Sequence, residues 1–88
     1  MKPVTLFYQP RCPFCKKALG YLEELQRQEP YSRIEIRMVI DELAEPEVAD
    51  RYDYYYVPTF YVGDKKVHEG GIMPDEVEAV LRMALDER

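Results

Sequence analysis

The chain has 88 residues and 47% of them are hydrophobic, so we expect one globular domain over residues 1–88 rather than a disordered polypeptide. Its formal net charge of −5 argues against nucleic acid as a partner, because phosphate binding needs a basic surface. Two cysteines and a short N-terminal apolar run exclude a disulfide-rich secreted scaffold, a signal peptide and a membrane span, which leaves the cytoplasm as the expected compartment and no membrane among the partners.

The chain opens with a pattern typical of a strand followed by a helix. Residues 3–8 are largely apolar, as in a buried central strand, and a turn follows them. A helix should begin near Cys12, because Pro13 suits the first helical position, where no N–H is needed. Its apolar residues recur at helical spacing, and it should end before Pro30. Gly20 is costly inside a helix, so we interpret it as a point of close packing.

The middle of the chain predicts a second strand and a second helix. Residues 34–40 alternate between apolar and polar side chains, which indicates a strand at the edge of a sheet with one exposed face. A polar connection follows. Pro46 then opens a short helix, whose apolar residues are Val48, Ala49 and Tyr52.

The last third predicts two strands and a final helix. Residues 57–62 and 65–69 are the strands, and Gly63 lies in the tight turn between them. Pro74 starts the helix, whose first turn contains two acidic residues that the helix dipole favours. The order β-α-β-α-β-β-α predicts an α/β fold: a four-stranded mixed sheet, its first two strands parallel, with helices on both faces.

The two cysteines, Cys12 and Cys15, are separated by two residues, and this spacing suits several kinds of site. A structural zinc site needs four ligands, but the chain adds only His68, which we expect to be an exposed strand residue with no role. A purely structural disulfide would close a very short loop and so remove little chain entropy. Neither a metal site nor a structural bridge is favoured.

A redox role for the pair has direct support. Cys12 falls at a helix N-terminus, where unpaired N–H groups and the dipole favour an anion, and Arg11 and Lys16 add positive charge. These effects lower the pKa of a thiol, and the thiolate is the species that attacks disulfides. Cys15 lies one turn further in the helix, where it can resolve a mixed disulfide on Cys12.

Three motifs together give the chain a family resemblance. C-P-F-C at residues 12–15, V-P-T at 57–59 and G-G at 70–71 occur in the expected element order, and with them the chain resembles a glutaredoxin of the thioredoxin-fold superfamily. The resemblance implies the thioredoxin fold and a cis peptide bond between Val57 and Pro58. It also implies that the backbone of Val57 pairs with the chain of the substrate.

The resemblance also implies which residues contact the substrate. These residues are Arg11, Pro13, Phe14, Val57, Pro58, Gly71 and Ile72. Further candidates are Tyr8, Gln9, Lys16, Tyr56 and Asp75. Two positions depart from the family pattern for glutathione, since Gln9 stands where a lysine is common and Ile72 follows the glycine pair where a small polar residue is common. The N–H groups of Gly71 and Ile72 could still receive a carboxylate.

Four tyrosines between residues 52 and 56 form an unusual run just before Val57. One interpretation is an aromatic rim that packs against a bound peptide or thiol, with Tyr8 as a further member. The other is that Tyr52 and one neighbour pack inward while the rest lie over the loop between the helix and the next strand. We expect Tyr52 to pack inward, and for Tyr56 both interpretations stay open.

The resulting hypothesis is a monomeric dithiol thiol–disulfide oxidoreductase that reduces protein or glutathione mixed disulfides. Glutathione, as a co-substrate, or a flavin-dependent reductase such as thioredoxin reductase would supply the electrons, and no cofactor is tightly bound. The alternative is a module that bridges two chains through an iron–sulfur cluster held by the first cysteine and glutathione. Pro13, which many cluster-binding glutaredoxins lack, weakens that alternative. A redox-sensing domain without turnover is a third possibility.

Overall fold

The computed structural model describes residues 1–40 and 52–86. In that part of the chain the elements are β1 (Val4–Tyr8), α1 (Pro13–Gln26), the 3-10 turn η1 (Tyr31–Arg33), β2 (Ile36–Ile40), β3 (Thr59–Val62), β4 (Lys65–Glu69) and α3 (Pro74–Asp86). None of these helices is long and apolar enough to cross a membrane. The short helix expected from Pro46, with Val48 and Ala49, falls in residues 41–51, outside the described part.

The start of α1 is set by its first two residues. Cys12 has extended backbone angles, φ −76° and ψ 124°, and Pro13 occupies the first helical turn, where its missing N–H costs nothing. The carbonyl of Cys12 accepts the N–H of Lys16 at 3.0 Å, the first bond of the helical ladder. The helix ends at Gln26, before Pro30, so the predicted beginning and end are both confirmed.

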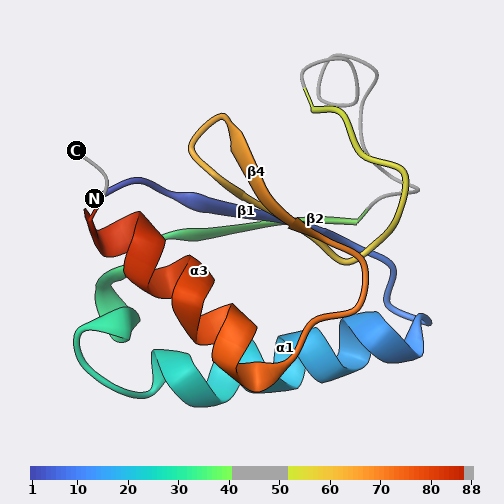
Figure 1. Cartoon of the computed structure of the whole chain (residues 1–88). Coiled ribbons are helices and arrows are strands. Elements are labelled where there is room, and N and C mark those ends of the chain that lie inside the picture. The colour runs from blue at the N-terminus through green and yellow to red at the C-terminus, as the bar shows by residue number, and fades with distance from the viewer. Residues whose placement is uncertain (41–51, 87–88) are drawn as a thin grey trace.

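The four strands form one mixed sheet in the order β2-β1-β3-β4. β1 pairs in parallel with β2 and antiparallel with β3, and β3 pairs antiparallel with β4. Gly63, in the turn between β3 and β4, has a φ of +60°, which glycine adopts without steric cost. These elements form the α/β thioredoxin fold that the resemblance implied (Figure 1).

Two strands are shorter than the alternation of side chains predicted. The strand expected over residues 34–40 begins at Ile36, because Ile34 caps the turn η1 and donates its N–H to Tyr31. It does lie at an edge of the sheet, as expected. The strand expected over residues 57–62 begins at Thr59, one residue after Pro58, which has no N–H to give to a ladder.

One face of the sheet carries the hydrophobic core. Because side chains alternate along a strand, Val4 and Leu6 of β1 and Phe60 and Val62 of β3 point to the same face, and all four are buried. Figure 1 shows α1 and α3 together on that side of the sheet. The helices contribute Ala18, Leu22, Val77, Val80, Leu81 and Ala84 to the core.

Aromatic side chains cover the other face. Phe7 and Tyr61 point away from the helices, and their rings pack with those of Tyr52 and Tyr54. The Phe7 and Tyr54 rings are stacked with centroids 4.5 Å apart. The helices α1 and α3 lie on the opposite face, and the third expected helix, from Pro46, falls outside the described residues.

The start of α3 is fixed by a carboxylate. Glu76 reaches back from the first turn, and its Oε1 accepts the N–H of Met73 at 3.0 Å, which is one half of a capping box. The helix dipole favours this negative charge, as the sequence predicted. The position of this helix end matters because the glycine pair lies immediately before it.

The interpretation of Gly20 as a point of close packing is wrong. A Cβ built on Gly20 would meet no atom within 4 Å beyond the neighbouring helix backbone, and the residue is exposed. Nothing in the described structure requires a glycine there.

Replacing Gly20 with alanine should therefore raise the free energy of unfolding by about 0.5–1 kcal/mol, because alanine loses less backbone entropy in a helix. Urea denaturation followed by circular dichroism measures the change. Gly63→Ala is the matched control and should lower stability, because Gly63 has a positive φ and its Cβ would lie 3.0 Å from the Lys2 side chain. Equal stability of the Gly20→Ala and natural proteins would contradict the prediction.

Candidate active site

Both cysteines lie at the beginning of α1, and both are free thiols. Cys12 is the residue before the helix and is half-buried, whereas Cys15 lies in the first turn and is fully buried. The difference follows from helix geometry, because Cys15 faces the sheet while Cys12 stands at the helix end. One thiol is therefore open to a substrate and the other is covered.

The pKa of Cys12 lies below the ordinary thiol value of 9.0. The largest cause is a hydrogen bond from the backbone N–H of Cys15, and the Cys15 thiol and the Phe14 N–H also favour the thiolate, while partial desolvation opposes it. We expected the charges of Arg11 and Lys16 to contribute, but the lowering interactions in the described part come from inside the turn. Both basic side chains are exposed, and water screens their charge.

The backbone before the helix holds the second thiol. The N–H of Gln9 lies 3.4 Å from the Sγ of Cys15, and the carbonyl of Gln9 accepts the N–H of Cys12 at 3.1 Å. The family resemblance placed Gln9 where a ligand side chain is common. In the structure, its backbone N–H and carbonyl contact Cys15 and Cys12 instead.

The second part of the site, after the start of α1, is the segment that leads into β3. The peptide bond between Val57 and Pro58 is cis, the isomer that the resemblance implied. Pro58 is buried and Val57 is half-buried. The carbonyl of Pro58 accepts the N–H of Gly70 at 2.8 Å, and the Thr59 hydroxyl donates to the carbonyl of Tyr56. These bonds hold the chain on both sides of Val57.

The glycine pair completes the site. A Cβ built on Gly71 would lie 3.3 Å from Cδ1 of Phe14, so the Phe14 ring packs against this glycine. With the bond from Gly70 to Pro58, the three motifs of the sequence meet at one place. The side chain of Ile72 lies in the core, so only its backbone could contact a ligand, and Asp75 is exposed in the first turn of α3.

The tyrosine run divides between the two interpretations. Tyr52 packs inward as expected, with ring centroids 5.0 Å from Phe7 and 4.7 Å from Tyr61. Tyr56 is exposed. The grouping of Tyr8 with these tyrosines is wrong, because Tyr8 packs against the core on the helix side. Alternation explains the error, since its neighbour Phe7 is the β1 residue that faces the tyrosines.

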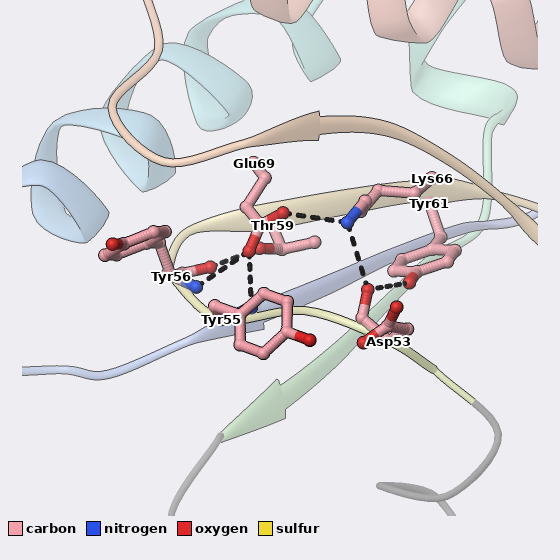
Figure 2. A network of polar contacts seen from close by, with 7 residues as sticks. All are labelled: Asp53, Tyr55, Tyr56, Thr59, Tyr61, Lys66 and Glu69. Atoms are coloured by element: carbon pink, nitrogen blue, oxygen red, sulfur yellow. Dashed lines mark hydrogen bonds and ion pairs between the residues drawn. The ribbon is translucent and has the colours of Figure 1, made fainter.

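A network of polar contacts that the sequence did not reveal supports the segment that leads into β3 (Figure 2). The carboxylate of Glu69 accepts the N–H groups of Tyr55 and Tyr56, the latter at 2.9 Å, and its other oxygen lies 2.8 Å from Nζ of Lys66. Lys66 also donates to the carbonyl of Asp53, 3.2 Å away. These donors hold the pKa of Glu69 at about 2. The network fixes the two residues that precede Val57.

His68 is not the exposed strand residue that we expected. Its side chain is only 21% exposed, and its Nε2 donates to the carbonyl of Gly71 at 2.8 Å. Its Nδ1 lies 3.8 Å from the carboxylate of Glu76, which caps α3. The imidazole therefore connects β4, the glycine pair and the helix end.

Comparison with known proteins agrees with this geometry. The sequence model of the glutaredoxin family matches residues 4–67, about three quarters of the chain. The match includes the C-P-F-C motif and the Val57–Pro58 bond, and it ends before the glycine pair. No match was found among the curated proteins. In residues 1–40 and 52–86, no group of three or more His, Cys, Asp or Glu side chains is arranged to hold a metal ion.

The rate at which iodoacetamide alkylates Cys12 should rise with pH and reach half of its maximum below pH 9.0, because the N–H groups of the first turn favour the thiolate. Mass spectrometry of the alkylated protein across a pH series measures the midpoint. The variant Cys15→Ala keeps the backbone N–H of that position and removes its thiol, so its midpoint should move only part of the way back to 9.0. A midpoint at or above 9.0 in the natural protein would contradict this assignment.

Protonation of Glu69 should lower the free energy of unfolding in acid. Its folded pKa is about 2, against 4.5 for an ordinary glutamate, so the unfolded chain takes up the proton at higher pH. The contribution of Glu69 is complete above about pH 4.5 and is lost as the pH falls toward about 2. Urea unfolding over this range should show a steeper loss for the natural chain than for Glu69→Gln. Glu24→Gln, on the exposed face of α1, is the control for removal of one charge, and parallel profiles for all three proteins would contradict the prediction.

Proposed function

Since the chain belongs to the glutaredoxin family, we propose that it is a dithiol thiol–disulfide oxidoreductase, with Cys12 as nucleophile and Cys15 as resolving thiol. Thiol–disulfide exchange is the general activity of this family. The observation that carries the assignment is the contrast between the two thiols: Cys12 is accessible with a lowered pKa, and Cys15 is buried one turn away. Attack needs an accessible thiolate, and resolution needs a second thiol that is close but covered.

In the first step, the thiolate of Cys12 attacks one sulfur of the substrate disulfide. A bond forms between that sulfur and Cys12, the original S–S bond breaks, and the other sulfur leaves as a thiolate that takes a proton from solvent. In the second step, Cys15 loses its proton and attacks Cys12. The reduced substrate leaves, and a disulfide joins the two cysteines. The N–H of Gln9, 3.4 Å from the Cys15 sulfur, holds this thiol in place for the attack.

The substrate chain would pair with the backbone of Val57. Support comes from the bonds on either side of this residue, because Glu69 binds the N–H of Tyr56 and Gly70 binds the carbonyl of Pro58. A backbone held at both ends loses little entropy when an extended chain pairs with it. Val57 is also half-buried rather than covered, which leaves room for such pairing.

Small-substrate contacts surround the reactive sulfur. We propose Pro13 and Phe14 as apolar contacts, since both are exposed beside Cys12. Arg11 and the N–H groups of Gly71 and Ile72 are the candidates for a substrate carboxylate.

Two electrons must return to the oxidised pair after each turnover. We propose glutathione or a flavin-dependent reductase as the donor, and the reducing cytoplasm as the setting. Incubating the oxidised protein with glutathione alone, and separately with thioredoxin reductase and NADPH, distinguishes the donors by the return of free thiols.

Cysteine variants test the assigned roles. Cys12→Ser should abolish turnover with every disulfide, because the serine hydroxyl is not ionised at neutral pH. Cys15→Ser should still be attacked by substrate but should accumulate a covalent mixed disulfide on Cys12, visible as an added mass. Circular dichroism confirms that both variants fold. Full turnover by Cys12→Ser, or an added mass on another residue, would overturn the assignment.

A further inference from the structure

His68 is a polar side chain to which the exchange reaction assigns no part. The thiols of Cys12 and Cys15 perform that chemistry, yet the imidazole lies beside the site and only 21% of its side chain is exposed. A covered polar side chain needs partners for its hydrogen-bonding atoms. Each ring nitrogen of His68 faces such a partner, the carbonyl of Gly71 for one and the carboxylate of Glu76 for the other.

The bond to Gly71 fixes which ring nitrogen carries a hydrogen. A carbonyl oxygen can only accept, so Nε2 of His68, 2.8 Å from that oxygen, carries a hydrogen whether the ring is neutral or charged. The other nitrogen, Nδ1, lies 3.8 Å from Oε2 of Glu76, which is too far for a hydrogen bond. Glu76 is itself held in place, because its Oε1 accepts the N–H of Met73. The imidazole is therefore a fixed donor between β4 and the first turn of α3.

The carbonyl that His68 binds belongs to the same peptide unit as the N–H of Ile72. In a trans peptide unit the C=O and N–H lie in one plane and point in opposite directions. The cis bonds of the described chain are those before Pro30 and Pro58, so the unit between Gly71 and Ile72 is trans. By holding the Gly71 oxygen on one side, His68 directs the Ile72 N–H to the other side, away from the imidazole.

Two consecutive N–H groups at this junction have no partner in the described part of the chain. The N–H groups on either side of them, those of Gly70 and Met73, form bonds of 2.8 and 3.0 Å. Between these two, the N–H groups of Gly71 and Ile72 donate to no described residue. The ring of Phe14 packs on Gly71, so both donors lie next to the turn that carries the redox pair.

We propose that His68 is a positioning residue of the substrate site, whose Nε2–H holds the Gly71 carbonyl and so keeps the Ile72 N–H aimed at a substrate carboxylate. The inference rests on the proposed function, which assigns a substrate carboxylate to the N–H groups of Gly71 and Ile72. His68 makes no contact with the reacting sulfurs and acts only through this peptide unit. A donor whose direction is fixed in advance loses little entropy when the ligand binds.

The charges close to these donors make their direction more important. Asp75 and Glu76 lie in the first turn of α3, immediately after the glycine pair, and both are exposed. One oxygen of Glu76 is bonded to the N–H of Met73, and solvent and salt screen the charge of Asp75. Because these carboxylates do not attract an anion, a substrate carboxylate depends on well-directed N–H groups.

Glutathione and its diamide test this role, because they have the same size and differ in their two carboxylates. Each is joined to thionitrobenzoate as a mixed disulfide. Attack on the glutathione sulfur forms a bond between that sulfur and Cys12 and releases coloured thionitrobenzoate, which gives the second-order rate constant for the reduced protein. The glutathione compound should react about tenfold faster than the diamide, the size expected of one hydrogen bond to a charged group. The ratio of the two rate constants cancels any general loss of reactivity.

Two variants separate the donor from the shape of the ring. His68→Phe keeps an aromatic ring that cannot donate, so the ratio should fall to about threefold or less. His68→Gln has a side-chain N–H that can reach the position of Nε2, and it should keep the ratio of the natural protein. Lys65→Gln, exposed at the other end of β4, is the matched control and should also keep it. An unchanged ratio in His68→Phe, or an equal fall in both His68 variants, would overturn the inference.

Nuclear magnetic resonance tests the same geometry in the natural protein, without a substitution. His68 is the one histidine of the chain, so the signals of its ring nitrogens are identified directly. The neutral ring should carry its hydrogen on Nε2. Addition of S-methylglutathione, which has no free thiol to exchange, should shift the amide signals of Gly71 and Ile72. A neutral ring with its hydrogen on Nδ1, or an Ile72 amide signal that does not move, would contradict the inference.

The symmetrical thionitrobenzoate disulfide separates failure of this inference from failure of the proposed function. If the reduced protein does not react with that reagent, the oxidoreductase assignment itself fails. If it reacts with the reagent but attacks the glutathione compound and the diamide at equal rates, the positioning role of His68 is disproved and the oxidoreductase assignment stands.

Discussion

The hydrogen bonds that the first turn of α1 directs at Cys12 are the interaction on which the site depends. They exist because Pro13 starts the helix one residue later and leaves the thiol at the helix end, where N–H groups have no helical partner. The core fixes this helix end in space, since Ala18 and Leu22 bury the same helix against the sheet. A local sequence signal thus sets the chemistry, and packing sets the place where it happens.

The second constraint is the bond from the N–H of Gly70 to the carbonyl of Pro58. It joins the end of β4 to the start of β3 at the point where the glycine pair turns toward α3, and Phe14 then packs on Gly71. His68 strengthens the same junction by binding the carbonyl of Gly71. Residues from three parts of the chain that are far apart in the sequence therefore form one site.

The difference between local and distant determinants explains what the sequence could predict. Helix starts at Pro13 and Pro74 depend on neighbouring residues and were predicted correctly. The Glu69 network was not predicted, because Lys66 and Glu69 are three residues apart in a strand and should face opposite sides of the sheet. In the structure Tyr61 pairs with Lys66 while Phe60 pairs with His68, so one extra residue bulges from β4 and brings both side chains to one face. Such a register shift leaves no mark in the alternation of polar and apolar residues.

The same bulge bears on the charge that a substrate meets. Glu69 lies beside the segment that leads to Val57, and an unpaired carboxylate there would add a free negative charge to the site. Its oxygens are instead occupied by Lys66 and two backbone N–H groups, and its pKa of about 2 reflects how strongly these donors compensate the charge. The negative charge of Glu69 therefore serves to hold the backbone that precedes Val57, at the edge of the site.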